Sequence, residues 1–501
     1  MDLQAFILCG KGAKLSPFTL ARGDSGLSKA LLPIANRHMI EYVLDWCEQA
    51  NFSEVVVVAG AEDSAQIQDA LKRYQEIREG QMALLARHGS NATTGCGTPL
   101  EPVPIKFMTA KHDQTGAILQ RELLPRIKGD FVLLPCDFVT EIPPQIFVDQ
   151  FRNKDPDNLA MAVRYRNTFD SFDKKQLDLS YTIYSENENS IKQPVLLDAY
   201  SQEDVERSKY LQTRSHLLWR YPNTSVSKKL LDASVYFCSY ELVELLKPAE
   251  LSTAISETES DNDDDTLGPK HADDLVQPIR FRAKCKLIKD AINCNKPIYK
   301  IFRDLARRSW QHSTPRETIG LFILPSLGLF IRSNILCAYM EANRCMLRVR
   351  SSLFATHGPS GVGNTIGGDS IVGANCTILE KGSIKLSVVG NNCRIGKRCR
   401  IVGSVILDNV EIEDECVLEN VIVGSFSKVG KKSKLTNSYV EGSYVVAAKT
   451  VVKGETLTHI YLEESDQGSS TTESSDDDED SDGYAEDYYD EEFEDDGLFE
   501  R

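Results

Sequence analysis

The sequence predicts two folded regions of different class, an α/β domain and a parallel β-helix, followed by an acidic tail. Strand-like and helix-like segments alternate in the first part, and aliphatic residues later recur every six positions. The last segment is rich in Ser, Asp and Glu, and 501 residues are too many for a single core. We expect an α/β domain at 1–350, with loop insertions near 85–100 and 250–275. The β-helix is expected at 363–460 and a disordered tail at 463–501.

Apolar segments of the first region follow the order expected of a Rossmann-like domain with a mainly parallel sheet. Ala5–Cys9, Val55–Ala59 and Phe131–Leu134 are short apolar runs typical of buried strands. Apolar residues recur at helical spacing in His38–Ala50, and Leu336–Val349 also has the character of a helix. Because strands and helices alternate, we expect a sheet covered by helices.

The β-helix prediction rests on a hexapeptide period between Ile366 and Val452. Aliphatic residues occur at steps of six, with steps of five between groups, and Val389, Ile406, Val423 and Val440 recur every 17 residues. A triangular parallel β-helix can bury such a period, because each side carries one strand with one aliphatic residue directed to the axis. A run of short antiparallel strands, the alternative, seldom holds so regular a period. Small residues are expected to supply the permissive corners, namely Gly373, Gly390, Gly396, Asn409, Gly424, Gly430 and Asn437.

Charge is concentrated in the tail, where Glu463–Arg501 contains 19 Asp and Glu residues against one Arg. The formal net charge of the whole chain is -17, so the remaining residues are almost neutral. A neutral body carries no general bias toward nucleic acid or anionic lipid, and we expect neither DNA nor membrane as a partner.

Other sequence features favour a cytosolic protein. The first residues lack the basic segment of a signal peptide, and the longest apolar stretch, Gly320 to Ile331, is broken by Pro325. Thirteen cysteines are scattered without a CxxC pair, so we expect them to be reduced and mostly buried.

Two segments near the N-terminus carry the clearest motif. Leu8–Thr19 is a glycine loop after the first strand, in which backbone N–H groups can approach a phosphate. Together with Ser28–Tyr42 it resembles the signature of the sugar-1-phosphate nucleotidyltransferases. In that signature a glycine loop ending in Thr-Arg-Leu precedes Lys-Pro-Leu-Leu-Pro and Asn-Lys-Pro-Met-Ile. A transferase domain followed by a left-handed hexapeptide β-helix is the layout of this superfamily, so the resemblance covers most of the chain.

The resemblance implies a nucleotide-binding site that is only vestigial. Its members would be the loop residues Gly10, Gly12 and Lys14 together with Lys29 and Asp137.

Several positions depart from the family pattern. Cys9 replaces a glycine, and Ala13 replaces the Thr or Ser that faces the phosphate. Lys14 replaces an arginine, which keeps the charge but loses the bidentate geometry on pyrophosphate. Ala30 replaces a proline, and Gln114–Gly116 stands where the family reads the base with Gly-Thr-Ala.

The metal site departs most. The enzymes need Mg²⁺ to neutralise charge while pyrophosphate leaves. Asp137 matches the first family carboxylate, but counting back from Tyr339 places Arg332 at the second, or Asn334 in a shifted alignment. Neither residue is a carboxylate, and an arginine opposes a cation. We therefore expect no metal, no cofactor and no catalytic residue.

A degraded transferase site joined to a β-helix resembles the gamma and epsilon subunits of translation initiation factor 2B. Leu134–Thr140, Arg303–His312 and Asp496–Arg501 look like the gamma type of fungi. An epsilon subunit would add a helical exchange domain, whereas the acidic tail follows Tyr461, so for a complete chain we expect the gamma type.

This resemblance implies a non-catalytic subunit of the guanine nucleotide exchange factor for translation initiation factor 2. The implied partners are the epsilon, alpha, beta and delta subunits and the G protein initiation factor 2. The main alternative is an active mannose-1-phosphate guanylyltransferase or a related sugar-nucleotide pyrophosphorylase. A free-standing scaffold is another, whereas an acyltransferase is disfavoured because no histidine lies between His357 and His459 to act as its general base.

Overall fold

The computed structural model describes ten stretches of the chain: 3–19, 26–87, 103–167, 179–186, 193–211, 213–247, 292–311, 317–326, 328–353 and 365–459. The expected insertion at 250–275 and the tail at 463–501 lie outside these residues, as does the part of the 85–100 insertion that follows Arg87. None of the helices in these stretches has both the length and the apolar character needed to cross a membrane.

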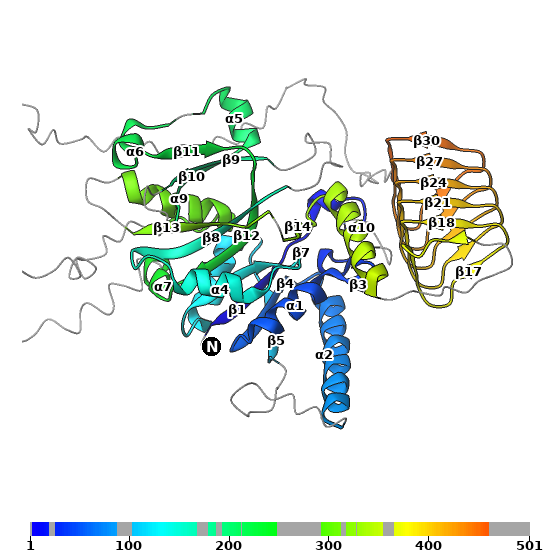
Figure 1. The fold of residues 1–501 in the computed structure, drawn as a ribbon, viewed down its shortest axis with the longest axis horizontal. Helices are drawn as coiled ribbons and strands as arrows, with labels where there is room; N and C mark the ends of the chain where they lie inside the picture. Colours follow the sequence, from blue (N-terminus) through cyan, green and yellow to red (C-terminus); the bar gives the residue numbers. More distant parts are fainter. Residues whose placement is uncertain are drawn as a thin grey trace, which may run out of the picture. The chain divides into compact units, whose positions relative to one another are not determined.

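A ten-stranded sheet organises the first region, in the order β11-β9-β10-β13-β8-β12-β6-β1-β4-β5 (Figure 1). The strands are β1 (Gln4–Cys9), β4 (Glu54–Gly60), β5 (Ile105–Ala110), β6 (Phe131–Pro135), β8 (Asn158–Arg166), β9 (Ser180–Ser185), β10 (Val195–Ser201), β11 (Thr224–Ser227), β12 (Leu230–Cys238) and β13 (Thr318–Ile323). Strands β6, β1, β4 and β5 are parallel, as predicted. Beyond β6 the sheet is mixed, because β12 runs antiparallel to both of its neighbours while β13 and β8 are parallel.

Helices cover both faces of this sheet, which confirms the predicted α/β class. The helices of this region are α1 (Met39–Ala50), α2 (Ser64–Arg87), α3 (Thr115–Ile118), α4 (Pro144–Arg152), α5 (Gln202–Ser208), α6 (Ser215–Arg220), α7 (Glu241–Leu246), α9 (Ile298–Gln311) and α10 (Leu336–Leu353). One core packs α1, α2 and α4 on one face, and a second packs α7 and α9 on the other. Adjacent residues of β1 show the alternation, since Ile7 belongs to the first core and Phe6 to the second.

Two small ribbons lie close to the sheet ends that matter for the site. One pairs β2 (Pro33–Ile34) with β3 (Arg37–His38), and the other pairs β7 (Phe138–Thr140) with β14 (Phe330–Arg332). The second ribbon joins segments that are almost 200 residues apart in the sequence, and it places Arg332 opposite Phe138.

The hexapeptide region forms three stacks of short parallel strands, as predicted for a left-handed β-helix (Figure 1). The first stack contains β15 (Thr365–Ile366), β18 (Ser383–Lys385), β21 (Arg400–Val402), β24 (Val417–Glu419), β27 (Lys434–Thr436) and β30 (Val451–Lys453). The second contains β16 (Ile371–Val372), β19 (Val388–Val389), β22 (Val405–Ile406), β25 (Ile422–Val423), β28 (Tyr439–Val440) and β31 (Thr456–Leu457). The third contains β17 (Thr377–Ile378), β20 (Arg394–Ile395), β23 (Glu411–Ile412), β26 (Lys428–Val429) and β29 (Val445–Val446).

The predicted axial residues lie in register from coil to coil. Ile401 pairs with Leu418, which pairs with Leu435, and all three are fully buried in one apolar cluster. Identical environments therefore repeat every 17 residues, which explains why the period is visible in the sequence.

The glycines of the corners have a different role from the one predicted. Gly373, Gly390, Gly396, Gly424 and Gly430 are not among the residues with positive φ. They allow close approach of the next coil, because a Cβ on Gly373 would lie 2.5 Å from the carbonyl oxygen of Gly390. Asn409 and Asn437 do adopt positive φ, and they share it with corner residues such as Arg398, Glu415 and Lys432.

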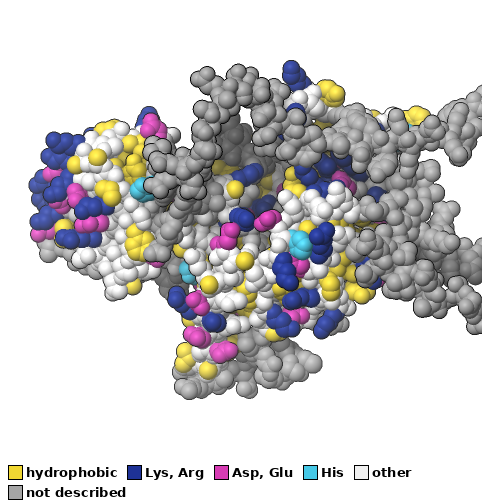
Figure 2. Space-filling model, turned by 180° about the vertical axis from the view of Figure 1, so that it is seen from behind, with side chains coloured by type: hydrophobic (Ala, Val, Ile, Leu, Met, Phe, Trp, Pro, Cys, Tyr) yellow, Lys and Arg dark blue, Asp and Glu magenta, His cyan; other side chains and the backbone are white. Residues whose placement is uncertain are grey.

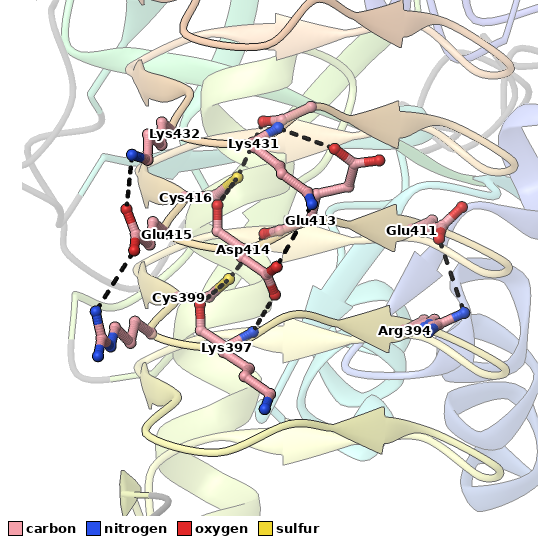
Figure 3. Close-up of polar contacts among 12 residues, drawn as sticks. Arg394, Lys397, Cys399, Glu411, Glu413, Asp414, Glu415, Cys416, Lys431 and Lys432 are labelled. Carbon is pink, nitrogen blue, oxygen red and sulfur yellow. Dashed lines mark hydrogen bonds and ion pairs between the residues drawn. The ribbon is translucent and has the colours of Figure 1, made fainter.

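Charged side chains form columns on the outside of the β-helix (Figures 2 and 3). Figure 2 shows Lys and Arg gathered there with Asp and Glu among them. In Figure 3, Arg394 faces Glu411 and Lys432 faces Glu415 on successive coils. Because neighbouring coils carry opposite charges at equivalent positions, these columns neutralise themselves.

Candidate functional site

The glycine loop begins where β1 ends, at the carboxyl edge of the parallel strands. Gly12 has a φ of 73° and precedes a single 3-10 turn at Ala13–Leu15. A Cβ on Gly12 would lie only 2.9 Å from the Cβ of Lys29, so the two motif segments are in contact. Gly10 and Lys14 are exposed on the same loop. The structure thus places four of the predicted residues around one turn.

Asp137 follows β6 directly and forms an ion pair with Lys29. The distance from Lys29 Nζ to Asp137 Oδ2 is 2.5 Å. The Asp137 side chain is completely buried and that of Lys29 is 11% exposed, so this pair is shielded from solvent. The structure therefore brings the predicted residues Lys29 and Asp137 together.

Arg332 makes the second contact to the same carboxylate. Its Nε donates a hydrogen bond to Asp137 Oδ1 at 3.2 Å, and the backbone N–H of Ser333 donates to the Asp137 carbonyl at 2.6 Å. The pairing of β14 with β7 fixes this position. A guanidinium therefore lies beside Asp137, at one of the two positions, Arg332 and Asn334, that the family resemblance aligned with a second metal-binding carboxylate.

The charges of this cluster stabilise one another. Burial favours a raised pKa for Asp137, but Arg332 and Lys29 outweigh burial and lower the pKa to about 2. For Arg332, burial favours a lower pKa, yet Asp137 and Asp232 hold the pKa above its ordinary value. At neutral pH the carboxylate and the guanidinium are both ionised.

A further set of hydrogen bonds continues from Arg332 into the sheet. Arg332 Nη1 donates to Ser234 Oγ at 2.6 Å, and the Ser234 N–H donates to Asp232 Oδ1 at 2.8 Å. Asp232 also pairs with Arg164, and it accepts from the Tyr236 hydroxyl at 3.1 Å. These bonds link the Asp137–Arg332 pair to strands β8 and β12.

Sequence reasoning missed Arg164, Asp232 and Ser234. A signal was present, because Arg164 and Asp232 are charged residues within largely apolar strands. Buried charges of this kind are normally paired, but the sequence does not identify the partner.

These residues do not fit a magnesium ion. Mg²⁺ prefers carboxylate oxygens, whereas the two oxygens of Asp137 already contact Lys29 and Arg332. Among the residues that the structure describes, no group of three or more His, Cys, Asp or Glu side chains is arranged to hold a metal ion.

The segment aligned with base recognition is in contact with the start of α9. Thr115 Oγ1 accepts a hydrogen bond from Ile298 N at 3.0 Å, and Gly116 N donates to the Lys296 carbonyl at 3.1 Å. A Cβ on Gly116 would lie 2.4 Å from that carbonyl oxygen. The polar groups of Thr115 and Gly116 therefore serve packing within the domain.

Comparisons with known proteins agree with both regions of the fold. Residues 5–170 match the nucleotidyl transferase family, and residues 361–455 match the family described as the EIF2B subunit epsilon LbH domain. Translation initiation factor eIF2B subunit gamma of Schizosaccharomyces pombe is 29% identical over 473 residues, covering 93% of this chain and 92% of that protein.

The matches cover different parts of the chain. The match to the epsilon LbH domain family is confined to the β-helix, whereas the similarity to subunit gamma extends through both regions. The predicted resemblance to gamma subunits is confirmed: the chain is similar to eIF2B subunit gamma along most of its length, with a part that matches the nucleotidyl transferase family and a part that matches the LbH domain family.

Proposed function

We propose that this chain is a subunit of the guanine nucleotide exchange factor for translation initiation factor 2. In this role its nucleotidyl transferase domain is a platform for protein partners and not an enzyme. Similarity to eIF2B subunit gamma along 93% of the chain supports the first part. The observation that carries the second part is Asp137, buried between Lys29 and Arg332.

The ion pairs oppose metal-dependent nucleotidyl transfer. To bind Mg²⁺, Asp137 would have to separate from two cations, and breaking a buried ion pair costs about 3–5 kcal/mol. Arg332 cannot relieve the conflict by losing its proton, because a guanidinium stays charged at any physiological pH. A vestigial nucleotide site at Gly10, Gly12, Lys14, Lys29 and Asp137 therefore lacks the ion that would neutralise a leaving pyrophosphate.

The implied partners follow from the same resemblance. The epsilon subunit is proposed as the direct partner in exchange, and the alpha, beta and delta subunits complete the factor in the cytosol. The substrate is the G protein initiation factor 2. Exchange requires that the assembly binds the nucleotide-free G protein more tightly than the loaded form. In this assembly, the present chain positions or stabilises epsilon.

Purification with a tag on the full chain tests the assignment. Epsilon and the other subunits should co-purify, and adding this chain to purified epsilon should accelerate GDP release from initiation factor 2. Recovery of none of these proteins, or an unchanged release rate, would overturn the proposal. An unrelated β-helix protein added at the same concentration serves as the control.

A nucleotidyl transfer assay tests the rival function. With Mg²⁺, GTP and mannose 1-phosphate, the purified chain should release no pyrophosphate. Release that depends on Mg²⁺ and disappears in Asp137→Asn, but persists in the exposed-site variant Lys72→Ala, would favour the guanylyltransferase. Thermal melting of each variant shows whether a lost signal reflects lost folding.

A further inference from the structure

Several large apolar side chains of the outer strand β11 and of the segment that precedes it are exposed to solvent. Tyr210, Leu218, Trp219 and Val226 are 64%, 49%, 76% and 51% exposed, and we call these four residues the edge patch. Figure 1 shows α6, which carries Leu218 and Trp219, next to β11 at the margin of the sheet. Exposed aromatic side chains grouped with aliphatic ones are characteristic of contact surfaces.

The patch is held on a fixed framework. Leu217 of α6 is buried in a cluster with Leu197 and Trp310, and Leu211 and Tyr221 pack against the same cluster. Arg220 Nη1 also donates to the carbonyl of Ser309 at 2.9 Å. Trp219 is therefore exposed because α6 directs Leu217 inward, and the surface exists before any partner arrives.

The main chain of β11 offers bonding groups at the same margin. In the described part of the chain β11 pairs with β9 alone, antiparallel. Glu186 N donates to Asn223 O at 3.2 Å, so alternation along the ladder directs Ser225 and Ser227 toward β9. The N–H and C=O groups of Thr224 and Val226 consequently point away from β9, as they do in a strand that can accept another strand.

Local charge indicates the chemistry of the occupant. Acidic residues flank this segment, because Glu203, Asp204 and Glu206 precede it in α5 and the exposed Glu186 donates its N–H to Asn223. From Arg207 to Lys229 itself the chain contains six Lys and Arg residues and no Asp or Glu, whereas the whole body outside the tail is almost neutral. Five of them are exposed, namely Arg207, Lys209, Arg214, Lys228 and Lys229. An acidic partner complements this rim.

We propose that the β11 edge and the edge patch bind an extended acidic segment of another protein, which adds to β11 as a strand and seats an apolar side chain on Trp219. Strand addition derives its affinity from main-chain hydrogen bonds and its specificity from alternate side chains. This inference is independent of the exchange-factor assignment.

Single-stranded RNA also binds aromatic and basic side chains, but it fits this surface less well. Bases stack on Trp and Tyr, and phosphates pair with Lys and Arg. Leu218 and Val226 have no ring on which a base can stack. The outward N–H and C=O groups of Thr224 and Val226 alternate as a peptide backbone does, so the peptide is the better match.

Fluorescence anisotropy of a labelled peptide of alternating Glu and Leu, with the full chain, tests the proposal. The peptide should bind, and Trp219→Ala should weaken binding by about tenfold or more, as expected for a central aromatic contact. Val226→Pro removes one outward N–H without breaking the β9 ladder, and should weaken binding similarly. Val226→Thr keeps that N–H and should weaken binding less than Val226→Pro does. Ile77→Ala should bind like the parent, because it alters a different exposed surface.

Two further probes separate the outcomes. A peptide N-methylated along one edge, or one with Lys in place of Glu, should not bind. The proposal is overturned if the Glu-Leu peptide does not bind, or if both Trp219→Ala and Val226→Pro bind it like the parent. It is also overturned if oligouridine binds at this patch, with a loss in Trp219→Ala but none in Val226→Pro.

Discussion

The two regions place their charges in opposite ways. On the β-helix, Glu415 lies between Arg398 and Lys432, with all three side chains 42–65% exposed. In the transferase domain, Asp137 lies between Lys29 and Arg332 with no exposure at all. The first arrangement follows from a 17-residue repeat, and the second joins residues more than 100 positions apart. The contrast teaches that two similar groups of three charges can contribute very differently to stability. An exposed ion pair contributes about 0–1 kcal/mol, whereas breaking a buried pair costs several kcal/mol.

Replacing Asp137 should have the largest effect. Asp137→Ala leaves the buried Lys29 and the partly buried Arg332 without their counter-charge and should lower the free energy of unfolding by about 3–5 kcal/mol. Urea denaturation followed by tryptophan fluorescence measures it, because all three tryptophans lie in the first region. A loss below 1 kcal/mol would show that the cluster is hydrated. The buried charges around Asp137 would then contribute no more to stability than the exposed charges around Glu415.

A cavity in the β-helix axis should have the next largest effect. Leu418→Ala removes a fully buried side chain and should destabilise the β-helix by about 2–5 kcal/mol. Hydrogen exchange of amides in β15–β31 should accelerate more than exchange of amides in the ten-stranded sheet. The exposed Val445→Ala is the matched control, and an equal effect there would contradict the assignment of axial residues.

Acid should weaken the buried cluster. The folded pKa of Asp137, about 2, lies below that of an unfolded Asp, about 3.9, so its stabilisation is complete above the unfolded value and is lost as pH falls toward 2. This difference in pKa corresponds to about 2.6 kcal/mol. Between pH 6 and pH 2, the free energy of unfolding, measured by tryptophan fluorescence, should therefore fall more steeply in the parent than in Asp137→Asn. Parallel curves would mean that Asp137 is not an ionised partner of Arg332.

The exposed column should respond least. Glu415→Gln removes the carboxylate between Arg398 and Lys432, and should cost less than about 1 kcal/mol. The cost should shrink further in 1 M salt, where charges are screened within about 3 Å. Thermal melting of the β-helix at low and high salt makes the measurement. A loss of stability that does not change with salt would mean that Glu415, like Asp137, is shielded from solvent.

Much of the fold was predictable because the spacing of apolar residues over short stretches of sequence determines which residues form strands, helices and coils. The hexapeptide step placed Ile401, Leu418 and Leu435 on the axis, and the apolar run at Phe131–Leu134 placed β6. The corner glycines show where local reasoning ends. Gly373 was expected to need a special backbone conformation, but what requires glycine there is the carbonyl of Gly390 in the next coil.

The candidate site was only half visible in the sequence. Gly12 and Lys29 were found because each belongs to a local motif. Asp232 and Arg164 were not found, because a single charge within an apolar strand does not reveal which distant strand neutralises it.

By itself the sequence determined the repeat of the β-helix and the order of strands and helices around the glycine loop. It also showed that position 332 carries an arginine and not a carboxylate. Local spacing encodes these features, since side chains alternate along strands and recur along coils by fixed geometry. Only the tertiary structure decided that the guanidinium of Arg332 contacts Asp137. The antiparallel pairing of β14 with β7 brings together residues 195 positions apart, and pairing across such a distance depends on the whole folded chain.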